Sequence, residues 1–384
     1  MKDTFKPHLF TPGPVEVPPE ILLEQALPLT HHRTPEFRKD FDSLLENLKT
    51  IIGLREGNLF LLPSSGTGAM EAAVVNLFEP GDRVLALCNG FFSERFAEIC
   101  QVYGLDTRWL EFDWGQSVDP AVVGQALQQD QEIKGVFTVF HDTSTGVVND
   151  LCAIGEVTSR YSTLLVADAV TGAAVSPLSA QDWKVDCVVG ASQKGLLAPP
   201  GLSFIALNAQ AMQACQQNST PRYYFDLRKF DTALKGAVTP SPWTPPIATL
   251  RALKKSTDRI LTLGLEQHYQ DQRRLAESIQ AGVEAIGLEL PVKKQDRSEA
   301  VTLVLAPEGI APGQIVAHLK QDWGIIIAGG LGKFKDTAFR IGHLGHLSIL
   351  DAVGFLFALE AVLNRLGYPC QPGASAQAVY QVLS

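Results

Sequence analysis

A carboxylate and an amine each follow a short apolar run of this chain. The run 163–167 leads into Asp168, and the run 186–190 leads into Ala191-Ser192-Gln193-Lys194. Such runs are typical of fully buried strands of a parallel sheet, where ligands bind beyond the carboxyl ends of the strands. We therefore expect Asp168 and Lys194 at one edge of one sheet. A lysine there can form a Schiff base and a carboxylate can hold a protonated ring nitrogen, the two groups that pyridoxal phosphate (PLP) chemistry requires.

Both residues also have plainer explanations. A loop lysine usually points into solvent, and an aspartate in Asp168-Ala169-Val170-Thr171-Gly172 can be a turn or capping residue. The occurrence of the two at equivalent strand ends favours the chemical interpretation.

A turn of small polar residues is suited to a phosphate. Ser64-Ser65-Gly66-Thr67-Gly68 follows the apolar run 59–62 and precedes the strong helix former 69–74. Small residues let the backbone approach a ligand, and the N-terminus of the helix adds free N–H groups and a positive dipole end. The alternative is an ordinary strand-to-helix turn with a serine cap. The turn is neither a Walker loop nor a dinucleotide fingerprint.

Three further segments carry candidate ligand-binding groups. Asp142-Thr143-Ser144-Thr145-Gly146 offers hydroxyl donors at a strand end, or forms a simple hydroxyl-capped turn. In Asn89-Gly90-Phe91-Phe92 an aromatic ring can stack on a flat ligand, although such a residue is more often core. Arg340 lies in the apolar stretch 338–342, so it requires an anion, either a substrate carboxylate or an internal acid.

The elements that must position these residues alternate along the chain. Between residues 20 and 255 we expect helices, among them 68–78 and 92–103, and strands at 58–62, 83–87, 107–110, 135–140, 163–167, 186–190 and 202–206. This alternation predicts a parallel sheet covered on both faces. A helical stretch at 247–286, interrupted near Gly264, then leads to strands at 299–305, 325–328 and 337–341 and helices at 312–322 and 349–366. The second pattern predicts a smaller α+β domain.

Composition excludes several functional classes. The chain of 384 residues has a net charge of −9, which argues against nucleic-acid binding and against adhesion to an anionic membrane. It has no run of 18 apolar residues, and residues 1–7 lack the apolar core of a signal peptide. The six cysteines are scattered, so we expect reduced thiols, no metal site and a cytoplasmic location.

The ordered set of motifs resembles the class V aminotransferases of PLP fold type I, most of all the alanine–glyoxylate and serine–glyoxylate group. The residues that carry the resemblance are Thr11-Pro12-Gly13-Pro14, His31-His32-Arg33-Thr34-Pro35-Glu36-Phe37, Ser65-Gly66-Thr67-Gly68, Asn89-Gly90-Phe91-Phe92, Thr143-Ser144-Thr145-Gly146-Val147, Ala167-Asp168-Ala169, Gly190-Ala191-Ser192-Gln193-Lys194, Ala198-Pro199-Pro200-Gly201, Gly329-Gly330-Leu331-Gly332 and Arg340-Ile341-Gly342. The resemblance implies an α/β fold with a large domain, built on a mainly parallel seven-stranded sheet covered by helices, and a smaller α+β C-terminal domain. We place an arm at residues 1–20, the large PLP-binding domain at 21–255, the small domain at 256–368 and a loose polar tail at 369–384.

The resemblance also implies roles for single residues. Lys194 would form the Schiff base and move the substrate proton, and Asp168 would pair with the ring nitrogen. The other implied contacts are Ser65, Gly66, Thr67 and Gln193 on the phosphate, Phe92 on the ring, Thr143 near the ring oxygen, Arg340 on the substrate carboxylate, and Thr244 on the phosphate of a partner subunit in a homodimer. Ser241 stands where some relatives have a tyrosine that crosses the dimer interface, and Trp243 lies in the same loop.

The implied activity is transfer of an amino group from alanine or serine to a small oxoacid such as glyoxylate, by a ping-pong mechanism. A PLP-dependent lyase or desulfurase is an alternative, but the segment 323–340 lacks the reactive cysteine that a desulfurase needs. A soluble-hydrogenase-type subunit is another alternative, although no cysteine cluster here could hold an iron–sulfur or nickel–iron centre.

Overall fold

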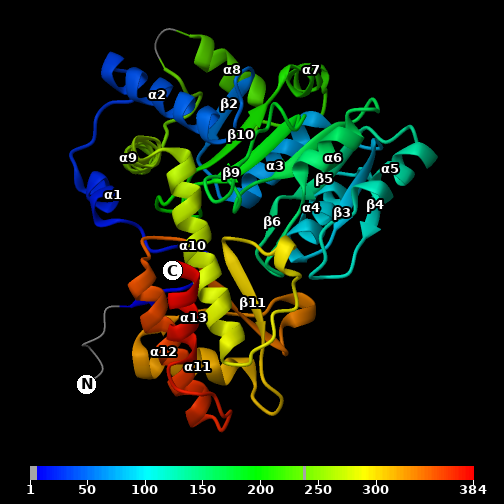
Figure 1. Ribbon diagram of the computed structural model, residues 1–384. Helices are drawn as coiled ribbons and strands as arrows, with labels where there is room; N and C mark the ends of the chain where they lie inside the picture. The colour runs from blue at the N-terminus through cyan, green and yellow to red at the C-terminus, as the bar shows by residue number, and fades with distance from the viewer. Residues whose placement is uncertain (1–6, 237–238) are drawn as a thin grey trace.

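A seven-stranded sheet forms the centre of the larger part of the molecule (Figure 1). The computed structural model describes residues 7–236 and 239–384. The strand order is β2–β10–β9–β8–β5–β3–β4, and β10 alone runs antiparallel to its neighbours in this sheet. The strands are β2 (Asn58–Leu62), β3 (Arg83–Cys88), β4 (Asp106–Glu111), β5 (Gly135–Val139), β8 (Leu164–Asp168), β9 (Cys187–Ala191) and β10 (Ser203–Leu207). The expected mainly parallel sheet of seven strands is confirmed.

Helices cover both faces of this sheet, as the continuous apolar strands require. Alternate residues of a strand point to opposite faces, and the buried residues divide accordingly. Val136 and Leu165 pack with helices α2, α5, α6 and α9, whereas Phe137 and Val166 pack with α3, α4, α7 and α8. The helices are α1 (Pro19–Leu23), α2 (Pro35–Ile51), α3 (Gly66–Leu77), α4 (Phe91–Val102), α5 (Pro120–Gln129), α6 (Leu151–Thr158), α7 (Ala209–Gln217), α8 (Leu227–Lys235) and α9 (Ile247–Leu263), with a short 3-10 turn η1 (Glu24–Ala26).

The C-terminal part is a smaller α+β unit below the large sheet in Figure 1. A three-stranded antiparallel sheet has the order β11–β14–β13. Its elements are α10 (Leu265–Ala285), η2 (Lys294–Asp296), β11 (Val301–Leu305), α11 (Pro312–Trp323), β12 (Ile325–Ile326), β13 (Ala328–Gly329), η3 (Gly332–Phe334), β14 (Ala338–Gly342), α12 (Ile349–Arg365) and α13 (Ala374–Leu383). The expected break in the long helical stretch falls at Gly264, between α9 and α10.

The expected single strand over 325–328 is wrong. Strand β12 pairs in parallel with β1 (His8–Leu9) of the N-terminal arm, whereas β13 pairs with β14. Ile327 lies between the two short strands, at the point where the pairing changes from β1 to β14. The arm therefore belongs to the smaller core, where Phe10 stacks on Phe355 with ring centroids 4.6 Å apart. Residues 1–6 of the expected arm lie outside the described residues.

The expectation of a loose tail at 369–384 is also wrong. Helix α13 packs against α10 and α12, and Val379 is buried in the smaller core. The buried carboxylate of Glu360 accepts hydrogen bonds from the backbone N–H groups of Gly373 (2.7 Å) and Ser375 (2.9 Å) and from the Ser375 hydroxyl (2.6 Å). A buried acid thus satisfies the free N–H groups at the start of α13, and the apolar face of the helix covers the core.

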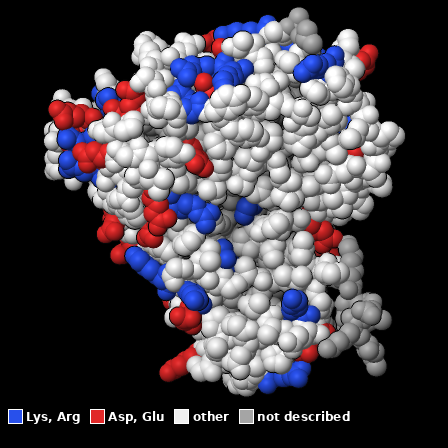
Figure 2. Space-filling model, turned by 180° about the vertical axis from the view of Figure 1, so that it is seen from behind, with Lys and Arg blue, Asp and Glu red and all other residues white. Residues whose placement is uncertain are grey.

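The proposed domain limits stay a prediction. Residue 255, the proposed boundary, lies inside α9, whose Ile260 still packs in the core of the large part. No helix within residues 7–236 and 239–384 is long and apolar enough to cross a membrane. On the face shown in Figure 2, charges of both signs are interspersed, with lysine and arginine side chains at the hollowed boundary between the two parts.

Candidate active site

Asp168 and Lys194 lie at the carboxyl edge of two neighbouring strands. Asp168 is the last residue of β8, and Lys194 follows β9 by three residues. The two strands are parallel and adjacent, with Asp168 in register with Val189. The structure therefore brings the carboxylate and the amine to one edge of one sheet.

Burial moves the pKa values of both groups toward neutrality. The pKa of Lys194 falls to about 8, because of burial first and then the nearby charge of Arg340, while Asp168 opposes the change. The pKa of Asp168 rises to about 7, because burial outweighs the hydrogen bond from the Val170 N–H and Asp142 adds a like charge. The Val170 N–H donates to Oδ1 at 2.7 Å, and within the described chain no group donates to Oδ2. Oδ2 is thus available to a donor such as a protonated ring nitrogen.

Arg340 reaches this edge from the smaller sheet. It lies in the middle of β14 and is only 8% exposed. Its Nε donates to the Gly329 carbonyl at 2.8 Å, and its Nη1 donates to the Thr143 carbonyl at 2.9 Å. Burial lowers its pKa to about 10. No carboxylate in the described part of the chain forms an ion pair with Arg340, so Nη2 remains available to bind an anion.

The turn 64–68 forms the N-terminus of helix α3. Ser65 caps the helix, its Oγ accepting from the Gly68 N–H at 3.4 Å. A side chain at Gly66 would place Cβ 2.6 Å from Val170 Cγ2, so a glycine is required for the close approach of α3 to the segment after Asp168. The buried Oε1 of Gln193 has no hydrogen-bond partner in the described structure. The free N–H groups at the start of α3 thus lie close to Ala191 at the end of β9, whereas the unsatisfied Gln193 oxygen is an acceptor, which an anion cannot use.

Phe92 and Thr143 are held by Asp142, a residue to which the sequence reasoning gave no role. The buried Asp142 carboxylate accepts from the N–H groups of Phe92 (3.1 Å) and Ser93 (3.2 Å), and from the N–H (2.9 Å) and Oγ (2.5 Å) of Ser144. It therefore joins the start of α4 to the turn that contains Thr143. The hydroxyl-rich segment 142–146 was the available signal, but burial of the acid could not be read from it.

The N-terminal arm covers the lysine, which the sequence reasoning also missed. The Nζ of Lys194 donates to the Pro12 carbonyl at 2.5 Å. Gly13 has φ +135°, and a side chain there would place Cβ 2.6 Å from Nζ. In the sequence, the Pro-Gly-Pro motif was the one available signal that the arm approaches Lys194 closely.

In the described structure, no hydrogen bond joins Thr244 to another candidate residue. Thr244 is exposed, in a loop where Trp243 stacks on Tyr224 with ring centroids 5.8 Å apart and Ser241 is buried. A contact from Thr244 to a partner subunit stays a prediction.

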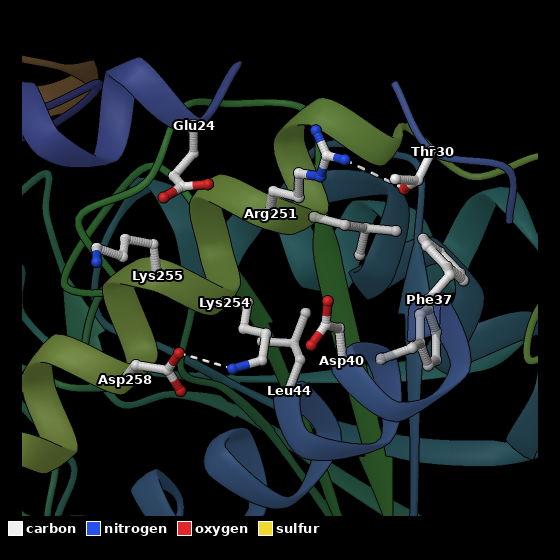
Figure 3. A pocket seen from close by; sticks show the side chains of 11 residues that line it. Glu24, Thr30, Phe37, Asp40, Leu44, Arg251, Lys254, Lys255 and Asp258 are labelled. Atoms are coloured by element: carbon white, nitrogen blue, oxygen red, sulfur yellow. Dashed lines mark hydrogen bonds and ion pairs between the residues drawn. The ribbon is translucent and has the colours of Figure 1, made fainter. Parts of the chain in front are cut away.

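A separate cavity involves none of these residues. It is lined by residues of α2 and α9 and of the segment between α1 and α2, as Figure 3 shows. Three of its charged groups are partnered within the protein: Lys254 Nζ binds Asp258 at 2.7 Å, and Arg251 donates to Pro28 and Thr30. It contributes no residue to the Lys194 site.

The residues at the sheet edge fit PLP. An amine, a carboxylate with one available oxygen and a helix N-terminus correspond to the carbonyl, the ring nitrogen and the phosphate of that molecule. The described residues contain no group of three or more His, Cys, Asp or Glu side chains arranged to hold a metal ion.

Comparisons with known proteins agree with this chemistry. A family model described as Aminotransferase class-V matches residues 24–333. The chain is 35% identical over 378 residues to an L-aspartate–glyoxylate aminotransferase of Paracoccus denitrificans, covering 97% of this chain and 95% of that one. It is 33% identical over 386 residues to a serine–glyoxylate aminotransferase of Methylorubrum extorquens, covering 98% and 96%. It is also 36% identical over 383 residues, covering 99% of both chains, to a Synechococcus protein named soluble hydrogenase, small subunit.

Solved structures extend the likeness to three dimensions. A ureidoglycine–glyoxylate aminotransferase of Bacillus subtilis matches with a TM-score of 0.94 at 28% identity, over 99% of this chain and 98% of that one. An alanine–glyoxylate aminotransferase of Nostoc matches with a TM-score of 0.90 at 28% identity, over 94% and 96%. The fold is therefore the α/β fold of the PLP fold type I aminotransferases. The chain belongs to the class-V aminotransferase family, and this membership implies PLP as the cofactor.

Proposed function

We propose that this protein is a PLP-dependent aminotransferase that moves the amino group of a small amino acid, alanine or serine, to glyoxylate by a ping-pong mechanism. One observation carries the proposal: a lysine of lowered pKa and a buried carboxylate follow neighbouring strands, and the buried guanidinium of Arg340, which pairs with no acid of the described residues, is close enough to lower the pKa of that lysine. These groups match an amine carrier, a ring-nitrogen partner and a carboxylate clamp.

Each residue has a defined task in this proposal. When bound, PLP supplies an electron-withdrawing ring that carries the amino group between the two substrates. Lys194 holds the cofactor and then takes and returns the proton at the substrate Cα, which its pKa of about 8 suits. Asp168 faces the ring nitrogen through its available oxygen, and Arg340 binds the substrate carboxylate.

The remaining assignments concern the cofactor's other groups. Ser65, Gly66, Thr67 and Gln193 bind the phosphate, Phe92 stacks on the ring, and Thr143 donates near the ring oxygen. Thr244 completes the phosphate site of a second subunit in a homodimer. A cytoplasmic location with reduced cysteines is part of the same proposal.

Glyoxylate is supported because it recurs in the names of the relatives, whereas the amino donor differs among them. Aspartate, serine, ureidoglycine and alanine each occur in those names. We favour a small donor because Arg340 requires only an α-carboxylate.

The test is a half-reaction screen. Purified protein loaded with PLP is mixed with each of the twenty amino acids, and the loss of its visible absorption band is followed. We expect alanine or serine to act fastest, and glyoxylate to restore the band. Lys194→Ala should abolish the band, whereas Lys184→Ala, at an exposed lysine paired with Glu156, should keep it. Purified protein that neither binds PLP nor catalyses transamination would refute the proposal.

The hydrogenase name of one relative motivates a second measurement. Iron–sulfur clusters are held by cysteine thiolates. Here five of the six cysteines are buried, and the described residues contain no group of side chains arranged to bind a metal. Stoichiometric iron or nickel in purified protein would favour the redox alternative.

The desulfurase alternative has its own test, because sulfide release from cysteine would favour it. A Thermococcus onnurineus cysteine desulfurase, with 16% identity and a TM-score of 0.72, shares only the fold.

A further inference from the structure

An arginine without an assigned role lies at the turn that we propose for the phosphate. Arg95 is in the second turn of α4, and its Nη1 donates to Thr67 Oγ1 at 3.4 Å. Its guanidinium carbon lies 4.9 Å from the centre of the Phe92 ring and 5.2 Å from that of Phe91. Arg95 is therefore held between the first turn of α3 and the ring that we expect to stack on the cofactor.

In the described part of the chain, no acid neutralises the guanidinium of Arg95. No carboxylate within residues 7–236 and 239–384 forms an ion pair with Arg95, and the adjacent Glu94 instead accepts from the Trp114 indole at 2.8 Å. Arg83, by contrast, binds Asp106, Asp130 and Glu132. A guanidinium has five N–H donors, so one long hydrogen bond to Thr67 leaves most of them for an anion.

The charge of Arg95 acts on the Asp168 carboxylate. It lowers the pKa of Asp168, although burial dominates and raises that value. The positive charge of Arg95 is therefore close enough to act on the Asp168 carboxylate.

None of the other residues that we assign to the phosphate carries a full positive charge. Ser65, Gly66, Thr67 and Gln193 offer only neutral donors, and the dipole of α3 contributes about half an elementary charge. Lys194 is used by the cofactor's carbonyl and Arg340 by the substrate carboxylate. A doubly charged phosphate is bound best by a planar guanidinium with parallel N–H groups.

We propose that Arg95 binds the cofactor phosphate together with the first turn of α3. The inference rests on the proposed function, since it presupposes PLP at Lys194. In this arrangement one side chain both contacts the phosphate and braces Phe92 through its cation–π contact.

The experiment compares PLP with pyridoxal, which lacks the phosphate. Cofactor-free wild type and Arg95→Gln are titrated with each compound, and the dissociation constants are measured by absorbance. We expect Arg95→Gln to weaken PLP binding by about tenfold to about hundredfold, as the loss of a charge-assisted hydrogen bond gives, and pyridoxal binding by less than about twofold. Inorganic phosphate should raise the melting temperature of the wild type but not that of Arg95→Gln.

Matched variants separate this role from others. Phe92→Leu should weaken the binding of both compounds by the same factor, because it removes stacking alone. Arg108→Gln removes the same charge from an exposed site on β4 and should change neither constant. Arg95→Lys keeps the charge, and should fall between wild type and Arg95→Gln; it carries the comparison if Arg95→Gln does not fold.

Equal losses for PLP and pyridoxal, or no loss for either, in the Arg95 variants would overturn the inference and leave the proposed function intact. A wild type that binds neither compound would instead refute the proposed function.

Discussion

At the scale of single residues, burial makes the chemistry of this site possible. Asp168 and Lys194 titrate near neutrality because both are withdrawn from water next to other charged groups. Arg340 stays charged at neutral pH although its pKa falls to about 10. At neutral pH, Arg340 is therefore cationic, and Asp168 and Lys194 are close to their pKa values. These states suit the roles that we propose for the three residues.

The raised pKa of Asp168 predicts how the stability of the cofactor-free protein varies with pH. Between about pH 4 and pH 7 the folded state binds a proton at Asp168 that the unfolded state has released, so the free energy of unfolding falls as pH rises. We expect the stability of wild type minus that of Asp168→Asn to decrease across this window, measured by urea denaturation. Asp182→Asn serves as the control: the hydrogen bond from Arg55 lowers the pKa of Asp182 to about 2, so its difference should be flat between pH 4 and pH 7 and should increase with pH only between about pH 2 and pH 4. A flat difference for Asp168 would contradict this expectation.

Arg340 gives a prediction about substrate binding. Arg340→Lys keeps the positive charge but loses the two N–H groups of Nη2, which the protein leaves available to a carboxylate. We expect kcat/KM for the amino donor to fall by about a hundredfold, as the loss of two charge-assisted hydrogen bonds implies, with PLP affinity unchanged. Arg365→Lys, at an exposed ion pair with Asp322, should behave as wild type in steady-state kinetics. A loss of PLP affinity equal to the loss of kcat/KM would argue against a substrate role.

At the scale of elements, buried acids connect segments that are distant in the chain. Asp142 joins the start of α4 to the Thr143 turn, and Glu360 of α12 caps the start of α13. In both cases a carboxylate satisfies N–H groups that a helix leaves free at its first turn. The Asp142 contacts fix the position of Phe92, and the Glu360 contacts hold the start of α13 against the smaller core.

The Glu360 cap can be tested by stability. Glu360→Gln would turn an amide N–H₂ toward the Gly373 or Ser375 donors and leave one of them unsatisfied. We expect a loss of about 1 to 3 kcal/mol in the free energy of unfolding, and faster amide exchange in α13. Glu277→Gln, at an exposed position of α10, is the control. Unchanged exchange in α13 would show that packing alone holds the helix.

At the scale of the whole molecule, the described surface carries an apolar segment that a single chain leaves exposed. Leu22, Leu23, Leu27 and Leu29 are 46%, 65%, 50% and 72% exposed. They lie in α1 and the segment that follows it, at the outer edge of the view in Figure 1. Exposed apolar groups of this extent mark an interaction surface, which the proposed homodimer would cover.

This surface predicts the oligomeric state. Wild type should sediment at about twice 41.6 kDa, whereas the double variant Leu23→Glu with Leu29→Glu should sediment as a monomer, because burying two charges opposes association. The monomer should also bind PLP more weakly if Thr244 of the second subunit contacts the phosphate. Val102→Glu, at an 81% exposed position elsewhere, should remain dimeric. A dimeric double variant would remove this segment from the interface.

The sequence by itself located the strands of the large sheet to within about one residue at each end. Runs such as 163–167 are buried on both faces, so their apolar continuity reveals them and places Asp168 and Lys194 at one edge. It did not determine contacts between segments far apart in the chain: the Pro12 carbonyl on Lys194, Asp142 under α4, Arg95 beside Thr67, or Glu360 beneath α13. Local patterns report only whether a residue faces the core of its own element. Which distant group then meets it, and so whether a charged side chain is neutralised or left for a ligand, is decided by tertiary packing.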